Sequence, residues 1–440
     1  MRRYRLWIGI LCFISVMVNI IWLTWTVSNL NPQTNKGVYG LNKPAFQVCP
    51  NASVSTDITY SPSVVLQKCA NIQIYAYAFV MLQNVVINPT KAKSKKGGED
   101  LTKVIGQEAD EEELQPQPGY FTINCDFENF KLLSNEYSLF LTKMTRLWMH
   151  VIVAQDGMLM FNETENTLTI AVHRIEYANL YHAMTEWYNT FLVAYVFRKL
   201  INCQINVLFL DGHPYSDLDL TWSTLFGKVT RASFIRQPTL YRNFILGMAG
   251  SSSPLNDHKS KSLPMVESFR NFFLIKHGIT ETVTKNCNQL NILFIWRHDY
   301  VAHPRNPSGK IKRKIRNEFE LLENARRFFP NHNIYGRQME QLNLKEQLIL
   351  ISKTNILIGM HGAGMSHVFF LETGSGVIEL FPKYTLPSNI HFKAMSRWRK
   401  LFYKSWQNVQ SWNEFDDGST YIHPTVIKYL IRRTVAKICI

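Results

Sequence analysis

Short apolar segments alternate with amphipathic segments through the second half of the chain, and this alternation limits the possible fold more than any other feature. Residues 291–296, 355–359 and 377–380 are apolar runs of strand length, and residues 317–328 have the apolar spacing of a helix. Strands that alternate with helices form parallel sheets, because each parallel connection crosses over the sheet. The sequence therefore predicts a compact α/β unit in this half.

The first half repeats the pattern less regularly. Residues 168–172 and 205–210 are predicted strands, and residues 179–200 between them form a predicted helix. With 440 residues, of which 46% are hydrophobic, the chain is long enough to bury two cores. We therefore expect an α/β fold with two facing Rossmann-like domains and a cleft between them, an N-terminal domain at residues 46–285 and a C-terminal domain at residues 286–440.

Two further segments have compositions that do not favour a core. Residues 89–119 are rich in Lys, Glu and Pro, which is typical of a mobile surface insertion. Residues 28–45 are rich in Asn, Pro and Gly and are predicted to be a short stem that precedes the folded region.

Residues 6–27 carry no charge and have the length that a helix needs to cross a bilayer, about 20 residues. Arg2, Arg3 and Arg5 precede this segment, so the positive-inside rule places residues 1–5 in the cytosol and the rest of the chain in the lumen. A cleaved signal peptide is the alternative, but its apolar core is usually shorter and a cleavage site of small residues does not follow. The sequence predicts a transmembrane anchor of type II topology.

The cysteines and the glycosylation triplets agree with a lumenal location. Of seven cysteines, Cys12 lies in the predicted anchor and six follow it, and these six allow fifteen disulfide connectivities. The pairing stays open, and the absence of CxxC spacing argues against a zinc or redox motif. Asn51 and Asn162 each begin an Asn-x-Ser/Thr acceptor triplet and are predicted glycosylation sites.

A glycine-rich turn follows the predicted strand at residues 355–359. Glycines let a backbone approach a ligand closely, and the N-terminus of a following helix offers free N–H groups that suit a diphosphate. Glu379, near the end of the next strand, is predicted to accept hydrogen bonds from a ribose diol. The alternatives are an ordinary strand-to-helix turn and a surface carboxylate. The candidate ligand residues of the turn are His361, Gly362, Ala363 and Gly364.

The chain is basic, with 48 Lys and Arg residues, 33 Asp and Glu residues and a net charge of +15. Seven of the basic residues lie between Arg297 and Arg316, where Asp299 is the only acidic one. Nucleic acid is not an expected partner, because aromatic residues are not interleaved as stacking platforms and the chain is predicted to be lumenal. Arg297, Arg305 and Arg313 are the candidate phosphate ligands, although a solvated basic face is the alternative for most of this segment.

Acid–base candidates lie in the first half. His182 and Glu186 are four residues apart and therefore share one face of the predicted helix, where a carboxylate can orient a histidine that acts as a general base. A buried core histidine is the alternative. Asp211, at the end of a predicted strand, is a further catalytic candidate.

The segment Asp217-Leu-Asp219 spells a short Asp-x-Asp pattern that can hold a divalent ion on a diphosphate. The pattern also precedes a predicted helix, where an aspartate that caps the helix is the simpler explanation. We therefore predict no metal site there.

At these residues the chain resembles the plant-type β-1,2-xylosyltransferases of N-glycan processing, a family that also includes the EGF-domain O-GlcNAc transferase and the O-mannose β-1,4-N-acetylglucosaminyltransferase. The resemblance extends over roughly residues 120–440 in the same order, and its most specific part is the Trp-Arg-His-Asp-Tyr-Val-Ala-His-Pro-Arg block. The matching stretches are residues 174–188, 209–213, 291–305, 316–318 and 358–367.

The resemblance implies a GT-B arrangement and an inverting reaction that needs no metal or other cofactor. It implies UDP-xylose as the donor, the β-mannose of an N-glycan core on secretory glycoproteins as the acceptor, and the Golgi membrane as the location. Two positions depart from the family, because Trp296 stands where an arginine is usual and Glu186 where an aspartate is usual. A UDP-GlcNAc-dependent transferase of the same family and a catalytically silent Golgi glycan-binding protein are the alternatives.

Overall fold

The computed structural model of the chain describes residues 64–65, 69, 71–75, 78–126, 148–197, 205–280, 285–386 and 388–440. The predicted anchor at residues 6–27, the predicted stem and Asn51 lie outside these residues. Within the described ranges, helices of the length and apolarity needed to cross a membrane are absent.

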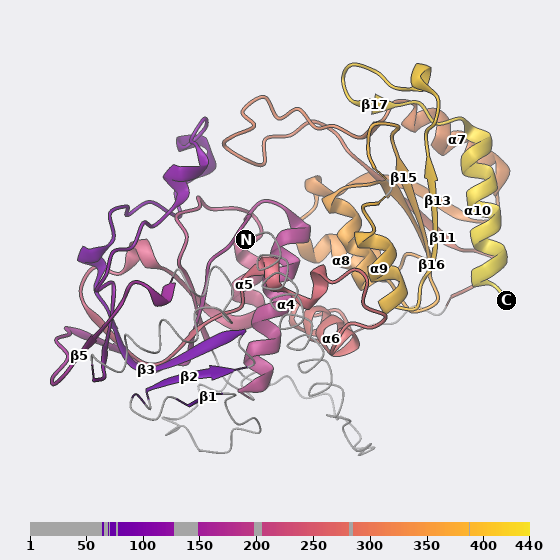
Figure 1. Cartoon of the computed structure of the whole chain (residues 1–440). Coiled ribbons are helices and arrows are strands. Elements are labelled where there is room, and N and C mark those ends of the chain that lie inside the picture. The colour runs from indigo at the N-terminus through magenta and orange to yellow at the C-terminus, as the bar shows by residue number, and fades with distance from the viewer. Residues whose placement is uncertain are drawn as a thin grey trace, which may run out of the picture. The chain divides into compact units, whose positions relative to one another are not determined.

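Contacts divide the chain into two compact units (Figure 1). Of the described residues, those within 1–177 and 185–254 form the N-terminal unit, and those within 178–184 and 255–440 form the C-terminal unit. Residues 255–280 contact the C-terminal sheet region, because α6 (Val266–Lys276) packs there and Arg270 donates to the carbonyl of Phe370 at 3.2 Å. The predicted domain boundary between residues 285 and 286 differs from this division of contacts.

The N-terminal unit is built on a mixed sheet with the strand order β1-β2-β3-β10-β7-β8-β9. The parallel part, β10-β7-β8-β9, contains the two strands predicted from apolar runs, and the helix that connects them is α4. The antiparallel part, β1-β2-β3-β10, has no counterpart in the sequence-based prediction. The strands of this path are β1 (Val64–Val65), β2 (Ile72–Tyr75), β3 (Phe79–Ile87), β7 (Thr169–Val172), β8 (Ile205–Phe209), β9 (Gly227–Arg231) and β10 (Thr239–Leu246).

Other elements complete this unit. Strand β4 pairs with β3 and β5, and β6 pairs with β10. Helix α4 spans the two units, since residues 180–184 belong to the C-terminal one. The bounds are β4 (Phe121–Asn124), β5 (Ile152–Gln155), β6 (Glu163–Glu165), α4 (Leu180–Val196) and α5 (Asp219–Phe226).

The predicted surface insertion at residues 89–119 contains the short 3-10 helices η1 (Pro89–Lys91), η2 (Leu101–Lys103) and η3 (Ala109–Glu112). Its backbone is hydrogen-bonded to the turn that follows β8, where Gly212 donates to the Glu112 carbonyl at 2.7 Å. Glu112 and Leu114 are buried. The segment thus contributes buried side chains although its composition does not favour a core, and its mobility stays a prediction.

The C-terminal unit contains a five-stranded parallel sheet with the order β13-β11-β14-β15-β16. The α/β unit predicted from the alternating pattern is confirmed, and the predicted strands correspond to β11, β14 and β15. The strands are β11 (Asn291–Trp296), β13 (Asn333–Gln338), β14 (Ile356–Met360), β15 (Gly376–Phe381) and β16 (Phe402–Gln407), and a separate pair joins β12 (Lys314–Ile315) to β17 (Ser419–Thr420).

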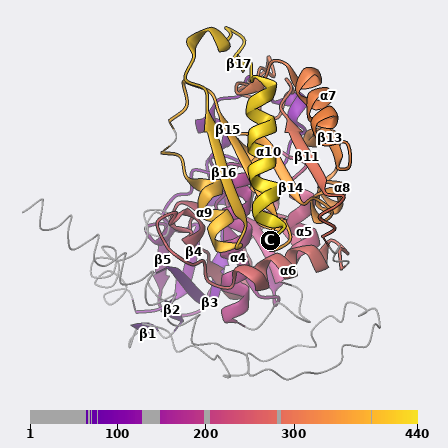
Figure 2. The ribbon, with the colours of Figure 1, turned by 90° about the vertical axis from the view of Figure 1, so that its right-hand side faces the viewer.

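Helices cover both faces of this sheet (Figures 1 and 2). Helices α7 and α10 pack on one face, where their apolar residues join Ile292, Phe294 and Ile358 in one core. Helix α9 and the 3-10 helix η8 pack against each other on the opposite side with α8. The bounds are α7 (Glu318–Phe328), α8 (Leu344–Ser352), η8 (Ala363–Phe370), α9 (His391–Trp398) and α10 (Pro424–Ile438).

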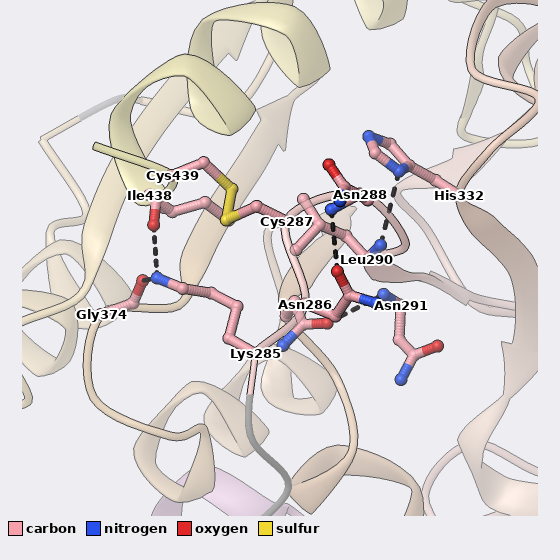
Figure 3. Close-up of a disulfide and its surroundings, with 11 residues drawn as sticks. Lys285, Asn286, Cys287, Asn288, Leu290, Asn291, His332, Gly374, Ile438 and Cys439 are labelled. Atoms are coloured by element: carbon pink, nitrogen blue, oxygen red, sulfur yellow. Dashed lines mark hydrogen bonds between the residues drawn. A yellow bond between two sulfur atoms is a disulfide. The ribbon is translucent and has the colours of Figure 1, made fainter.

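Disulfides within the described residues join Cys69 to Cys125 and Cys287 to Cys439. The Cα atoms of the second pair are 5.7 Å apart, which is the usual spacing of a disulfide. Figure 3 shows that this bond links the segment before β11 to the end of α10, where the Lys285 ammonium also donates to the Ile438 carbonyl. The sequence had left the pairing of these four cysteines open.

Candidate active site

The glycine turn connects β14 to η8 and carries the predicted diphosphate ligands. His361 donates its backbone N–H to the Leu380 carbonyl at 2.8 Å, so the turn begins anchored to β15. The first hydrogen bond of η8 runs from the Met365 N–H to the Gly362 carbonyl, which leaves the N–H groups of Ala363 and Gly364 without a partner inside the helix. These two N–H groups are therefore available to donate hydrogen bonds to a bound anion.

Arg297 follows β11, the strand next to β14, and its guanidinium lies against the turn. A Cβ atom placed on Gly362 would be 2.2 Å from the Arg297 Nη1 atom, so a side chain at this position would displace the guanidinium from the turn. The Nε–H of Arg297 donates to the Lys312 carbonyl at 3.3 Å. The structure therefore brings together a predicted phosphate ligand and the turn that is predicted to bind the same phosphate.

Arg313 lies close to Arg297. Burial lowers the pKa of Arg297, and the positive charge of Arg313 lowers it further. Burial also lowers the pKa of Arg313. Among the described residues neither guanidinium forms an ion pair with a carboxylate, so two partly buried positive charges face each other. An anionic ligand would relieve this repulsion and accept several hydrogen bonds.

Arg305, the third predicted phosphate ligand, lies exposed in the loop between Arg297 and Arg313. Its Nη2 atom is 2.6 Å from Nε2 of His303. Its contact with a ligand stays a prediction.

Glu379, predicted to bind a ribose, is fully buried in β15 and contacts the glycine turn instead. His361 donates from Nδ1 to one oxygen of the Glu379 carboxylate at 2.5 Å, and the Tyr403 hydroxyl donates to the other oxygen at 2.5 Å. Asn389 donates to Nε2 of His361 at 3.2 Å, which fixes the Nδ1–H tautomer. In this structure Glu379 holds the His361 ring, and a direct ribose contact stays a prediction.

A group of histidines adjoins His361 within the C-terminal unit. The ring of His391 lies 4.3 Å from that of His258 and 6.0 Å from that of His361, measured between ring centroids. Burial, together with the charges of His258, His361 and His182, lowers the pKa of His391 to about 3. The predicted base His182 therefore contributes to the electrostatics of this cluster, while its catalytic role stays a prediction.

Asp211, the predicted catalytic carboxylate of the N-terminal unit, is buried in an ion pair. Arg174 donates to its two oxygens from Nη2 at 2.7 Å and from Nε at 3.0 Å. Burial alone would raise the pKa of Asp211, but the charge of Arg174 outweighs it and the net pKa is lowered far below the usual range. This geometry is that of a structural ion pair, and a base role for Asp211 stays a prediction.

Asp219 belongs to the same buried network. Its carboxylate accepts from Arg174 at 2.7 Å and from Arg231, so both of its oxygens are already bound. It is the first residue of α5 rather than its N-cap, because Leu218 occupies the cap position. Groups of three or more His, Cys, Asp or Glu side chains arranged to hold a metal ion are absent from the described residues.

Glu186, the predicted partner of His182, is buried in the N-terminal unit. Its Oε1 atom accepts the backbone N–H of Ile175 at 2.7 Å. Burial raises the pKa of Glu186 well above its ordinary value, although the hydrogen bond from Ile175 and the charge of Arg174 oppose this shift. The predicted pairing of Glu186 with His182 stays a prediction.

The structure also places two residues that bear on the predicted family and glycosylation. Trp296 packs into the core that α7 and α10 cover, with its indole over Gly336 of β13. Trp296, which stands where the family usually has an arginine, thus contributes to this core. Asn162 is exposed just before β6, as an acceptor of an N-glycan must be.

Several residues around the turn were missed by the sequence-based prediction. Asn389 and Tyr403 contact the His361–Glu379 pair, and Tyr181 packs against His391, which lies beside His258 in the group of histidines. They come from separate segments and have no characteristic spacing. The one signal in the sequence was the position of Tyr181 beside His182 in a segment that carries the family resemblance.

The sequence of the chain is similar to those of several known proteins. The model of the glycosyltransferase 61 family matches residues 140–378. The chain is 29% identical to a β-1,2-xylosyltransferase of Oryza sativa subsp. japonica over 357 residues, which are 72% of this chain and 66% of the relative. It is 25% identical to a β-1,2-xylosyltransferase of Arabidopsis thaliana over 275 residues, 53% of this chain and 50% of that relative.

A third relative is the EGF domain-specific O-linked N-acetylglucosamine transferase of Rattus norvegicus, which is 32% identical over 116 residues, 26% of this chain and 21% of the relative. The chain thus spans less than two thirds of the length of each of these relatives. The matched family region includes both the glycine turn and the Arg297 loop. The chain belongs to the glycosyltransferase 61 family.

Proposed function

We propose that the protein is an inverting glycosyltransferase that moves xylose from UDP-xylose to the core β-mannose of N-glycans in a β-1,2 linkage. The observation that carries the proposal is the contact of Arg297 with Gly362, beside Arg313 and the free N–H groups of the turn. This arrangement suits a diphosphate leaving group, and two β-1,2-xylosyltransferases are similar to the chain over more than half of its length.

The proposed role of each donor-site residue follows from its chemistry. The guanidinium groups of Arg297 and Arg313 neutralise the negative charge that grows on the diphosphate as the bond to the sugar breaks. The N–H groups of Ala363 and Gly364 donate to the same oxygens. Glu379, Tyr403 and Asn389 hold His361 in one tautomer, so that the turn keeps one shape through the reaction.

On the acceptor side, the reaction needs a base that takes the proton of the acceptor hydroxyl. The sequence favours His182 or a neighbouring carboxylate. Asp211 and Glu186 are weaker candidates, since the carboxylate of Asp211 is bound by Arg174 and that of Glu186 is buried and accepts the backbone N–H of Ile175.

We include in the proposal the organisation that the sequence predicts. The two Rossmann-like units adopt a GT-B arrangement, residues 6–27 anchor the chain in the Golgi membrane, and the enzymatic part lies in the lumen. The resemblance to the family supports these statements, and the uncharged apolar segment at residues 6–27 and the two Asn-x-Ser/Thr triplets support the anchor and the lumenal location.

The test is a comparison of donors with the full-length chain in detergent. UDP-xylose and UDP-GlcNAc are offered side by side with a truncated N-glycan that exposes the core mannose, with and without a chelator. We expect transfer of xylose that EDTA does not reduce. Transfer of GlcNAc alone would reject the xylose donor, and failure to bind UDP in calorimetry would instead favour a silent glycan-binding protein.

A further inference from the structure

The C-terminal unit holds His258 in one tautomer through a hydrogen-bond chain that none of the roles above uses. The Tyr181 hydroxyl donates to Oδ1 of Asn256 at 2.8 Å and lies 2.7 Å from Nε2 of His258. A phenol has one proton, and an amide oxygen only accepts. The hydroxyl must therefore accept from His258, which places the ring proton on Nε2 and leaves a lone pair on Nδ1.

The backbone around His258 is fixed as well as the ring. Arg397 of α9 donates to the carbonyls of His258 and Ser260, the first at 2.7 Å. The indole N–H of Trp398 donates to the same Ser260 carbonyl at 3.0 Å. Because three hydrogen bonds from two side chains of α9 hold this loop, the ring of His258 keeps its position relative to the turn that follows β14.

The Nδ1 atom of His258 has no hydrogen-bond partner among the residues that the structure describes. The ring lies 4.3 Å from that of His391, which in turn lies 6.0 Å from that of His361 in the glycine turn. A short row of imidazoles therefore leads from the free Nδ1 atom to the site proposed for the diphosphate.

The charge state of the cluster suits proton uptake by His258. Burial lowers the pKa of His258, Asp257 raises it and Arg397 lowers it, so the ring is neutral at pH 7. His391, with its pKa lowered to about 3 chiefly by burial, is too weak a base for this task. The titratable and charged groups that face the two rings are Tyr181, His182, Asp257, His361 and Arg397.

We propose that His258 is the catalytic base of the transfer and that Tyr181 and Asn256 are its positioning residues. The inference rests on the proposed function. The Nδ1 atom takes the proton of the acceptor hydroxyl, and the hydroxyl oxygen forms the new bond to the anomeric carbon. The bond from that carbon to the diphosphate breaks, its electron pair leaves with UDP, and the imidazolium returns its proton to solvent.

The first experiment replaces His258 in the full-length chain. The variant His258→Gln keeps an N–H that can donate to Tyr181 but has no basic nitrogen. We expect kcat to fall by about 10²–10⁴-fold while UDP binding measured by calorimetry stays unchanged. The acid limb of the pH profile of kcat/KM should disappear, and added imidazole should partly restore the rate of His258→Ala.

A second variant tests the positioning role. Tyr181→Phe removes the acceptor that holds the Nε2–H tautomer, so we expect a smaller loss of kcat, a shifted acid limb and unchanged UDP binding. His332→Gln is the matched control, because His332 precedes β13 at the amino end of the parallel sheet, the edge opposite the glycine turn. Its rate and pH profile should equal those of the unchanged protein.

The outcomes separate this inference from the function on which it rests. If His182→Gln removes the acid limb and His258→Gln does not, the base is His182 and the inference is overturned. Parallel loss of turnover and UDP binding in His258→Gln would also overturn it, since that pattern indicates a structural role. If the unchanged protein neither binds UDP nor transfers a sugar, the proposed function itself fails.

Discussion

The guanidinium of Arg297 occupies the space in which any side chain at position 362 would have to lie, since a Cβ atom on Gly362 would approach its Nη1 atom to 2.2 Å. The steric constraint on position 362 therefore comes from a side chain that follows another strand, and not from the backbone angles of Gly362, which are extended. The glycine and the arginine act as one unit of the candidate donor site.

The variant Gly362→Ala should displace Arg297 and weaken donor binding. We expect kcat/KM to fall by about 10²-fold, comparable to the loss of one preorganised donor. Gly364→Ala should cost clearly less, because its Cβ atom would meet only Ile295 at 3.5 Å, an ordinary contact. Steady-state kinetics of both variants test this. Equal losses of kcat/KM would argue against a role for the contact between Arg297 and Gly362.

The variant Arg297→Ala should lower kcat by about 10²–10³-fold and weaken UDP binding, since a charge that faces the leaving group is lost. Arg327→Ala is the matched control, because Arg327 is exposed in the last turn of α7. Calorimetry with UDP measures the loss of UDP binding, and circular dichroism checks the fold. Unchanged UDP affinity in Arg297→Ala would remove this residue from the donor site.

The buried network of the N-terminal unit should contribute to stability rather than to turnover. Asp219→Asn leaves Arg174 and Arg231 without a shared carboxylate, which should cost about 3–5 kcal/mol of unfolding free energy. Lys228→Ala breaks the exposed pair with Glu165 and should cost about 0–1 kcal/mol. Urea unfolding of both variants measures the two losses of unfolding free energy. Similar losses in the two variants would contradict the prediction.

His213 should make the stability of the N-terminal unit depend on pH. Burial lowers the pKa of His213, but Asp211 and its hydrogen bond to Glu112 outweigh burial, so the folded pKa is raised. The stabilisation is thus complete below the unfolded pKa of about 6.5 and is lost as the pH rises through the folded value. The melting temperature should fall over that window, and His213→Gln should flatten the fall. If the melting temperature falls equally with pH in the unchanged protein and in His213→Gln, the assignment to His213 is refuted.

The Cys287–Cys439 disulfide should stabilise the C-terminal unit. It closes a loop with a sequence separation of 152 residues, for which the chain-entropy model gives about 5 kcal/mol. The double variant Cys287→Ala/Cys439→Ala should therefore lower the unfolding transition of this unit. The corresponding Cys69→Ala/Cys125→Ala variant should affect the N-terminal unit instead, and differential scanning calorimetry can separate the two results.

The parallel sheet of the C-terminal unit was predictable because its central strands are continuous apolar runs separated by an amphipathic helix. Strands β13 and β16 were not, because they lie at the two edges of the sheet and carry polar residues such as Arg337 and Lys404. An edge strand is covered on fewer sides and so leaves a weaker apolar pattern.

The same limit applies to the site. Arg297 and the glycine turn were found because each follows a predicted strand directly. Asp211 also follows a strand, but its partner Arg174 is 37 residues away in sequence, so a catalytic carboxylate and a structural ion pair have the same local pattern. His258 and His391 meet only through folding, and no spacing in the sequence could have paired them.

The bond between Cys287 and Cys439 makes the backbone from the start of β11 to the end of α10 a closed covalent ring (Figure 3). A protease that cuts one exposed loop inside this ring opens it without releasing a fragment. The cut chain would keep the Arg297 loop and the glycine turn tethered to each other, and the two pieces would separate only after reduction. The pieces of the C-terminal unit would thus stay covalently linked after a single backbone break. Cys287 and Cys439 also lie close enough to be joined by a short peptide in a circular permutant.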